Sequence, residues 1–164
     1  MKRLENRLNS ITELCELSGS QDVNTDIILT LCGKKIGSGS SRSVYEFNMD
    51  PKKLVVKIEG ETLHNPNLVE YWLWDEIRGL KGSLAWVKQW FAPIRFCSPN
   101  GRILIMERTS QDGKKERPNK IPEFFSDVHI NNFGWLNGKF VCHDYGFLYK
   151  FVKYEKKFQN VKWY

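Results

Sequence analysis

Two short polar segments organise this sequence: Asp127-Val-His-Ile-Asn-Asn132 and, shortly after it, Val141-Cys-His-Asp-Tyr-Gly146. Their spacing allows two acids, Asp127 and Asp144, to converge with the amide of Asn132 on one metal-bound polyphosphate. Carboxylate and amide oxygens are hard ligands of the kind that Mg²⁺ accepts. Taken alone, either segment is better explained as an ordinary polar loop, because Asp, His and Asn bond readily to their own backbone in turns. The segments upstream therefore decide between the two interpretations.

A glycine-containing turn lies in the segment Ile36-Gly-Ser-Gly-Ser-Ser-Arg-Ser-Val-Tyr45. It separates two β-prone stretches, Lys35-Ile36 and Val44-Tyr-Glu-Phe47, so we expect a hairpin between antiparallel strands. A dinucleotide-binding loop would open a helix, and a Walker A loop would contain Gly-Lys-Ser/Thr, so both are excluded. Glycines at such a turn let backbone N–H groups approach phosphates. A plain hairpin turn is the alternative.

Lys57 interrupts the buried strand expected over Leu54-Val-Val-Lys57-Ile-Glu59. A buried ammonium without an anion is costly, whereas an edge-strand lysine can reach solvent by snorkelling. The following helix supplies a candidate anion, Glu70. Asn65 can cap this helix and Pro66 suits its first turn. Glu70 lies beside an apolar stripe formed by Val69, Trp72, Leu73, Ile77 and Leu80. We expect a Lys57–Glu70 ion pair, the alternative being an ordinary surface glutamate.

Further turn signals divide the remaining chain. Ser98-Pro-Asn-Gly101 joins two strands expected over 93–97 and 102–107, and Asn137-Gly138 predicts a second hairpin over 132–143. Residues 110–120 form a polar loop. An amphipathic helix is expected near the start, between Leu4 and Ser18, packed against the back of a sheet. The alternating aromatic and basic residues of 147–164 fit a helix or a strand equally.

Length and composition indicate one folded domain. The chain has 164 residues, is 41% hydrophobic and carries a net charge of +6, a balance that favours anionic partners but is more simply a solvated basic face. No RNA-binding motif surrounds its 6 Trp and 10 Phe, so we expect no nucleic-acid partner. The 4 Cys show no C-x-x-C pair, which predicts reduced thiols. Without an export signal or a membrane-length apolar run, we expect a cytoplasmic protein.

The order of these motifs resembles the protein-kinase-like superfamily, and most closely the compact kinase-like proteins of bacterial viruses and the aminoglycoside-phosphotransferase branch, which also use Asp-x-His-x-x-Asn. The resemblance covers 34–146, about two thirds of the chain. It implies an α+β fold with a five-stranded antiparallel N-lobe sheet, an αC-type helix and a strongly truncated C-lobe. The single domain 1–164 would comprise a helical extension (1–33), the N-lobe (34–109) and a minimal C-lobe (110–164). For a phage-encoded protein, the compartment would be the bacterial host cytoplasm.

The resemblance also assigns roles, with ATP and Mg²⁺ as cofactors. Asp127 would be the catalytic base, acting with Lys57, and Asn132 and Asp144 would bind Mg²⁺. The backbone of Glu107 and the two residues after it would form the hinge that meets the adenine. The residues implied at the nucleotide site are Gly37, Gly39, Val44, Lys57, Glu70 and Glu107.

Departures from the kinase pattern leave two functions open. Arg42 replaces the third glycine, which would stiffen the loop or add a cation near the phosphates. Phe125-Ser126 stand where protein kinases have His-Arg, so regulation by loop phosphorylation is not expected. Only 18 residues follow Gly146, too few for a helical substrate platform. The chain would be either a minimal phosphotransferase, whose acceptor is supplied by a partner protein or a second copy, or a pseudokinase-like module that grips a partner without turnover.

Overall fold

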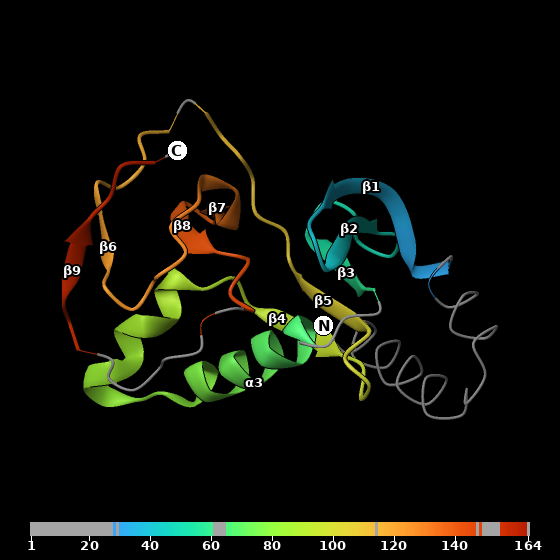
Figure 1. The fold of residues 1–164 in the computed structure, drawn as a ribbon, viewed down its shortest axis with the longest axis horizontal. Coiled ribbons are helices and arrows are strands. Elements are labelled where there is room, and N and C mark those ends of the chain that lie inside the picture. Colours follow the sequence, from blue (N-terminus) through green and yellow to red (C-terminus); the bar gives the residue numbers. More distant parts are fainter. Residues whose placement is uncertain are drawn as a thin grey trace.

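The computed structural model describes residues 28, 30–60, 65–113, 115–146, 148 and 155–163 (Figure 1). Five antiparallel strands form its main sheet, in the order β1-β2-β3-β5-β4. Their bounds are β1 (Cys32–Ser38), β2 (Arg42–Phe47), β3 (Leu54–Glu59), β4 (Ile94–Cys97) and β5 (Ile103–Glu107). The predicted α+β class and the five-stranded antiparallel sheet are therefore confirmed. The helix predicted between Leu4 and Ser18 lies outside the described residues.

The two faces of the main sheet bury different sets of side chains because successive strand residues point to opposite sides. On one face, Leu54 and Val56 of β3 pack with Ile103 and Ile105 of β5. On the other face, Val55 of β3 and the even-numbered apolar residues of β5 join the larger core. Lys57 shares the alternation of Val55, so it faces the larger core.

Helix α3 (Pro66–Gly79) follows β3 and contacts β3, β4 and β5. Pro66 occupies the first turn as predicted, but Asn65 caps the helix only by position: its φ is 39° and its side chain makes no capping bond. The predicted apolar stripe is wrong at Trp72, which is 64% exposed. Two polar residues, Asn67 and Glu70, are buried instead, because they bond to groups of the sheet. The buried face consists of Pro66, Asn67, Glu70, Leu73 and Ile77.

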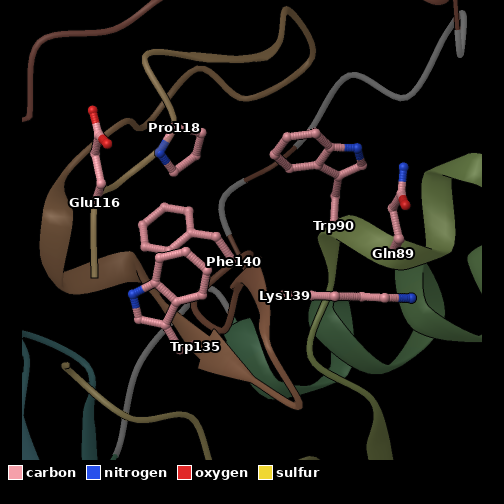
Figure 2. Close-up of a pocket in the computed structure, with 7 residues that line it drawn as sticks. All are labelled: Gln89, Trp90, Glu116, Pro118, Trp135, Lys139 and Phe140. Atoms are coloured by element: carbon pink, nitrogen blue, oxygen red, sulfur yellow. The ribbon is translucent and has the colours of Figure 1, made fainter. Parts of the chain in front are cut away.

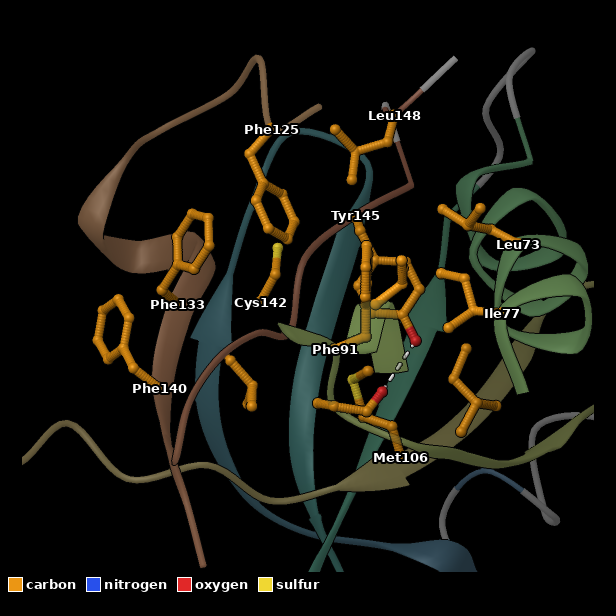
Figure 3. Close-up of a cluster of buried hydrophobic side chains, with 14 of the residues drawn as sticks. Leu73, Ile77, Phe91, Met106, Phe125, Phe133, Phe140, Cys142, Tyr145 and Leu148 are labelled. Atoms are coloured by element: carbon orange, nitrogen blue, oxygen red, sulfur yellow. Dashed lines mark hydrogen bonds between the residues drawn. The ribbon is translucent and has the colours of Figure 1, made fainter. Parts of the chain in front are cut away.

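A 3₁₀ helix, η1 (Gly82–Trp90), continues from α3 and was not predicted. It leads into Phe91, which lies in the middle of the larger core beside Tyr145 (Figure 3). The rings of Phe91 and Tyr145 meet edge to face at 5.1 Å. The Tyr145 hydroxyl donates to the carbonyl oxygen of Ala92 at 2.9 Å, so this buried polar group is satisfied.

The rest of the chain forms two short antiparallel pairs. Strand β6 (Lys120–Pro122) pairs with β9 (Phe158–Asn160), so the end of the chain contains a strand, one of the two alternatives left open. After η2 (Ile130–Asn132), β7 (Phe133–Leu136) and β8 (Lys139–Cys142) form the predicted hairpin. Its turn residues Asn137 and Gly138 have φ of 49° and 80°, the positive values that Asn-Gly adopts most easily.

Figure 1 shows how these parts are arranged. The main sheet lies on one side of the molecule, the β6–β9 pair on the opposite side, and the β7–β8 hairpin between them. Helices α3 and η1 run along one edge, and they contact each other. The larger core includes residues of α3, η1, β5 and β8, so it joins the two sides.

Three of the four cysteines lie in the described part of the chain. Cys32, Cys97 and Cys142 are free thiols, of which only Cys142 is buried, and Cys15 lies outside the described residues. Burial raises the pKa of Cys97 to about 12. None of the helices in the described part of the chain is both long and apolar enough to cross a membrane.

Candidate functional site

The predicted ion pair between Lys57 and Glu70 is confirmed. Lys57 Nζ lies 3.0 Å from Glu70 Oε1 and 2.9 Å from Oε2. Its third donor reaches the carbonyl oxygen of His143 at 2.6 Å. All three ammonium donors are therefore used, and the residue is only 3% exposed. Strand β3, helix α3 and the chain after β8 meet at this one nitrogen.

Arg42 joins the same carboxylate from strand β2. Its Nη1 lies 3.0 Å from Glu70 Oε2 and its Nη2 lies 3.1 Å from Glu70 Oε1. Nη2 also forms an ion pair with Asp144 Oδ1, and Nη1 donates to Asn67 Oδ1 at 3.2 Å. Burial lowers the pKa of Arg42, but the charges of Glu70 and Asp144 outweigh it and raise the pKa overall. Arg42 thus points inward, into an ion network.

The N-terminus of α3 is held against the sheet by Asn67, which sequence reasoning did not identify. Its backbone N–H donates to Glu59 Oε2 at 2.9 Å. Its side-chain amide donates to the carbonyl oxygens of Lys57 at 3.3 Å and Gly101 at 2.8 Å. The available signal was its spacing, since a residue three before Glu70 lies on the same helix face.

Glu70 also accepts hydrogen bonds from the backbone of the Asp144 segment. The N–H groups of Tyr145 and Gly146 donate to Oε1 at 2.8 and 3.1 Å. A Cβ on Gly146 would lie 2.9 Å from the carbonyl oxygen of Pro66, so only glycine fits this approach without a shift. Burial alone would raise the pKa of Glu70, but the charges and hydrogen bonds of Arg42 and Lys57 lower it to about 2. Glu70 is therefore ionised at neutral pH.

His143 connects Thr109, which follows β5, to the first polar segment. Its Nε2 donates to the carbonyl oxygen of Asn131 at 2.9 Å. Its Nδ1 lies 2.8 Å from Thr109 Oγ1 and, in the neutral tautomer, accepts the hydroxyl proton. Burial, followed by the charge of Lys57, lowers the pKa of His143 to about 4. A neutral imidazole thus ties Thr109 to Asn131.

The structure brings Asp127, Asn132 and Asp144 together through backbone contacts. The N–H groups of His143 and Asp144 donate to the carbonyl oxygen of Asn132 at 2.8 and 3.3 Å. The side-chain amide of Asn132 donates to the carbonyl oxygen of Asp127 at 3.4 Å. Asp127 is exposed, and the side chain of Asp144 is 42% exposed. These are the positions of the predicted base and metal ligands.

Magnesium fits this donor set when phosphates or water supply the remaining ligands. In the part of the chain that the structure describes, no three His, Cys, Asp or Glu side chains gather as a metal site. Asn132 and Asp144 would supply two oxygen ligands, which suits Mg²⁺ when substrate phosphates and water supply the others. One carboxylate oxygen of Asp144 is already paired with Arg42. Partial burial and the charge of Glu70 raise the pKa of Asp144. The charges of Lys57 and Arg42 lower it and offset part of this increase.

The remaining predicted nucleotide residues lie in the main sheet or in the turn between β1 and β2, and only Val44 is paired with a member of this network. Val44 of β2 lies directly opposite Lys57 of β3. The hairpin turn is closed by the N–H of Gly39, which donates to the carbonyl oxygen of Arg42 at 2.8 Å, and Gly37 lies in β1. The N–H of Glu107 donates to the carbonyl oxygen of Pro93 at 2.9 Å, so this amide is not available to an adenine edge.

A cavity of about 330 Å³ lies away from this network. It is bounded by η1, the segment 116–118 and the β7–β8 hairpin (Figure 2). Trp135 and Phe140 line one side with Pro118, and Trp90 lies opposite them. Its charged residues, Glu116 and Lys139, have opposite signs, so the cavity lacks the positive charge that a polyphosphate requires.

Comparison of the chain with protein-family models, curated proteins and solved structures gave no match.

Proposed function

We propose that the chain is a minimal, kinase-like phosphotransferase that uses ATP and Mg²⁺. The observation that carries the proposal is the buried Lys57–Glu70 pair, which is bonded directly to the segment of Asp144. Burying two charges costs free energy, and a buried ion pair usually contributes no more stability than apolar side chains of similar volume. A buried pair of this kind is easier to explain by a polyphosphate ligand than by stability alone.

Each residue of the site would perform a step that its position allows. Lys57 would neutralise the α and β phosphates, and Glu70 would keep its ammonium in place. Asn132 and Asp144 would hold Mg²⁺, which would neutralise charge on the transferred phosphate. Asp127 is exposed and lies next to Asn132, so it would accept the proton of an incoming acceptor hydroxyl.

Nucleotide binding is the first test. A ligand that binds the native state preferentially raises the unfolding temperature, so millimolar Mg–ATP should stabilise the wild type in a thermal-shift titration. Lys57→Met, which keeps the apolar stem and removes the charge, should lose this response. Lys53→Met changes an exposed lysine just before β3 and should keep it. If the wild type shows no shift with or without Mg²⁺, the proposal fails.

A second candidate function is a pseudokinase-like binding module. The observation in its favour is that Lys57 already uses its three donors and that Arg42 already pairs with Asp144. A module of this kind would bind its partner protein equally well after Asp127→Asn. Radiolabelled ATP distinguishes the two, since only the enzyme transfers phosphate to itself, to host proteins or to water.

Partners and location follow from the same proposal. Nucleotide and an acceptor or partner protein are expected, and nucleic acid is not. A cytoplasmic location would supply the ATP.

A further inference from the structure

The contact between Arg42 and Asp144 links the β1–β2 hairpin to the predicted metal ligand. Arg42 lies at the start of β2, and Asp144 lies 102 residues later, after β8. The ion pair places a guanidinium on a carboxylate oxygen that Mg²⁺ would need. Two positive charges on that oxygen repel each other, so the arginine competes with a cation for it.

The environment of the two side chains shows which of them can move. The Arg42 side chain is 5% exposed and is also held by both oxygens of Glu70 and by Asn67. The Asp144 side chain is 42% exposed. Breaking the contact from the arginine side would also remove the bonds of Arg42 to Glu70 and Asn67, which is costly in a buried site. Breaking it from the aspartate side requires only rotation of a half-exposed side chain.

The charges around the contact favour the arrival of a further cation. Arg42 and Lys57 face three carboxylates, Glu59, Glu70 and Asp144, so the network carries one excess negative charge when all are ionised. A polyphosphate without a metal would add negative charge to this network. A divalent cation bound to Asp144 would reverse the sign.

We infer that Arg42 is a resident counter-ion of Asp144, and that a divalent cation binds only after it has taken this carboxylate from the arginine. The inference rests on the proposed function, because it assumes that Asp144 is a metal ligand. It makes Arg42 a positioning residue that sets the affinity for the metal. The freed Nη2 of Arg42 then remains beside Asp144, anchored by Glu70.

Replacement of Arg42 by lysine tests the inference while keeping the charge of the network. An ammonium lacks the fork of the guanidinium and cannot bond Glu70 and Asp144 in the same way. Binding of Mn²⁺, a substitute for Mg²⁺, is measured on the full chain from the loss of the free-ion electron paramagnetic resonance signal. Arg42→Lys should bind Mn²⁺ more tightly than the wild type, by about tenfold, since close charge pairs have large coupling energies.

Two further variants separate the contact from other effects. Arg42→Lys combined with Asp144→Asn should lose the gain, because the carboxylate that the lysine frees is gone. Arg95→Lys makes the same exchange in an exposed ion pair with Glu107 and should leave Mn²⁺ affinity within about twofold of the wild type. Circular dichroism checks that each variant is folded. If Arg42→Lys proves unstable, the wild type saturated with Mg²⁺ should still show a changed Arg42 guanidinium resonance by NMR.

The outcomes distinguish this inference from the proposed function. Equal or weaker Mn²⁺ binding by folded Arg42→Lys overturns the inference, as does a gain that survives Asp144→Asn. If the wild type nevertheless gains thermal stability from Mg–ATP, the proposed function stands without it. If no variant binds Mn²⁺ and Mg–ATP does not raise the unfolding temperature of the wild type, the inference and the proposed function are both overturned.

Discussion

At the scale of single residues, Glu70 is the group on which the ion network depends. It is fully buried and accepts hydrogen bonds from Arg42, Lys57 and the backbone amides of Tyr145 and Gly146. Burying a charge costs free energy that only close partners offset, so a complete network is tolerated and an incomplete one is not.

Glu70→Gln should therefore destabilise the fold strongly. The neutral amide keeps the shape but leaves the charges of Arg42 and Lys57 without their common anion, which typically costs about 3–5 kcal/mol. Urea denaturation followed by circular dichroism measures the loss. Glu76→Gln changes an exposed glutamate of the same helix and should alter the free energy of unfolding by no more than about 0.5 kcal/mol. Equal effects of the two substitutions would mean that the network does not contribute as described.

His143 should make stability depend on pH. Its pKa is lowered from 6.5 to about 4 in the folded protein, so between these values the unfolded chain binds more protons. The contribution of the neutral His143 to the free energy of unfolding is therefore fully present above pH 6.5. It decreases as the pH falls toward 4, by up to roughly 3 kcal/mol. Glu70 adds a second loss at lower pH, as the pH falls from 4.5 toward about 2.

The contribution of His143 is isolated by comparing the wild type with His143→Gln. Urea denaturation midpoints between pH 7 and 4 should fall for the wild type and stay nearly level for the variant. The amide of Gln can still donate to the Asn131 carbonyl but does not titrate. An unchanged slope in His143→Gln would assign the pH dependence to other groups.

At the scale of elements, the sequence predicts the turns and helices that depend on residues close together in the chain. The Asn137-Gly138 turn was predicted because few residues accept positive φ at two successive positions. Helix α3 was predicted with Glu70 turned toward Lys57, but the rest of its buried face was not, because hydrophobic periodicity places Trp72 inside and cannot anticipate that Asn67 has partners in the sheet. The 3₁₀ helix η1 has no regular apolar period and gave no signal.

The approach of the Asp144 segment to α3 predicts the effect of Gly146→Ala. The added Cβ would lie 2.9 Å from the Pro66 carbonyl oxygen and 3.4 Å from Glu70 Cγ. Either the helix or the segment must shift, which costs about 1–3 kcal/mol and weakens the bond from the Gly146 amide to Glu70. Thermal denaturation measures the cost.

The matched control is Gly79→Ala, at the end of the same helix. Apart from its chain neighbours and the backbone of its own helix, no atom lies within 4 Å of the added Cβ, so this change should be neutral or stabilising by up to about 1 kcal/mol. If both alanines had the same effect, the close approach at Gly146 would not be restrictive in solution.

At the scale of the whole molecule, contacts between distant segments assemble the candidate site. Lys57 Nζ and the His143 carbonyl oxygen are 86 positions apart in sequence, and no local pattern predicts that they meet. The motif order indicated the neighbourhood of Lys57, Glu70 and Asp144, whereas the occupation of Asp144 by Arg42 became visible only in three dimensions. At the far side, Gln159 of β9 donates to the carbonyl oxygen of Phe125 at 2.6 Å, which fixes the chain two residues before Asp127.

The two acids of the proposed site have different roles, so their substitution should impair different steps. Asp127 would act only on the acceptor proton, so Asp127→Asn should leave Mg–ATP affinity within about twofold and reduce phosphate transfer by about 100-fold or more. Asp144 would hold the metal with nucleotide already bound, so Asp144→Asn should weaken Mg-dependent binding itself.

Radiolabelled ATP measures both quantities on the same preparations, by filter binding and by transfer to protein or water. Asp112→Asn changes an acid of the 110–120 loop, outside the proposed site, and should affect neither. A base that acts after the nucleotide is bound affects transfer but not binding. Equal transfer by wild type and Asp127→Asn would therefore show that Asp127 is not the base. Absence of transfer in the wild type, with partner binding retained in Asp127→Asn, would instead favour a module that uses the same pocket without turnover.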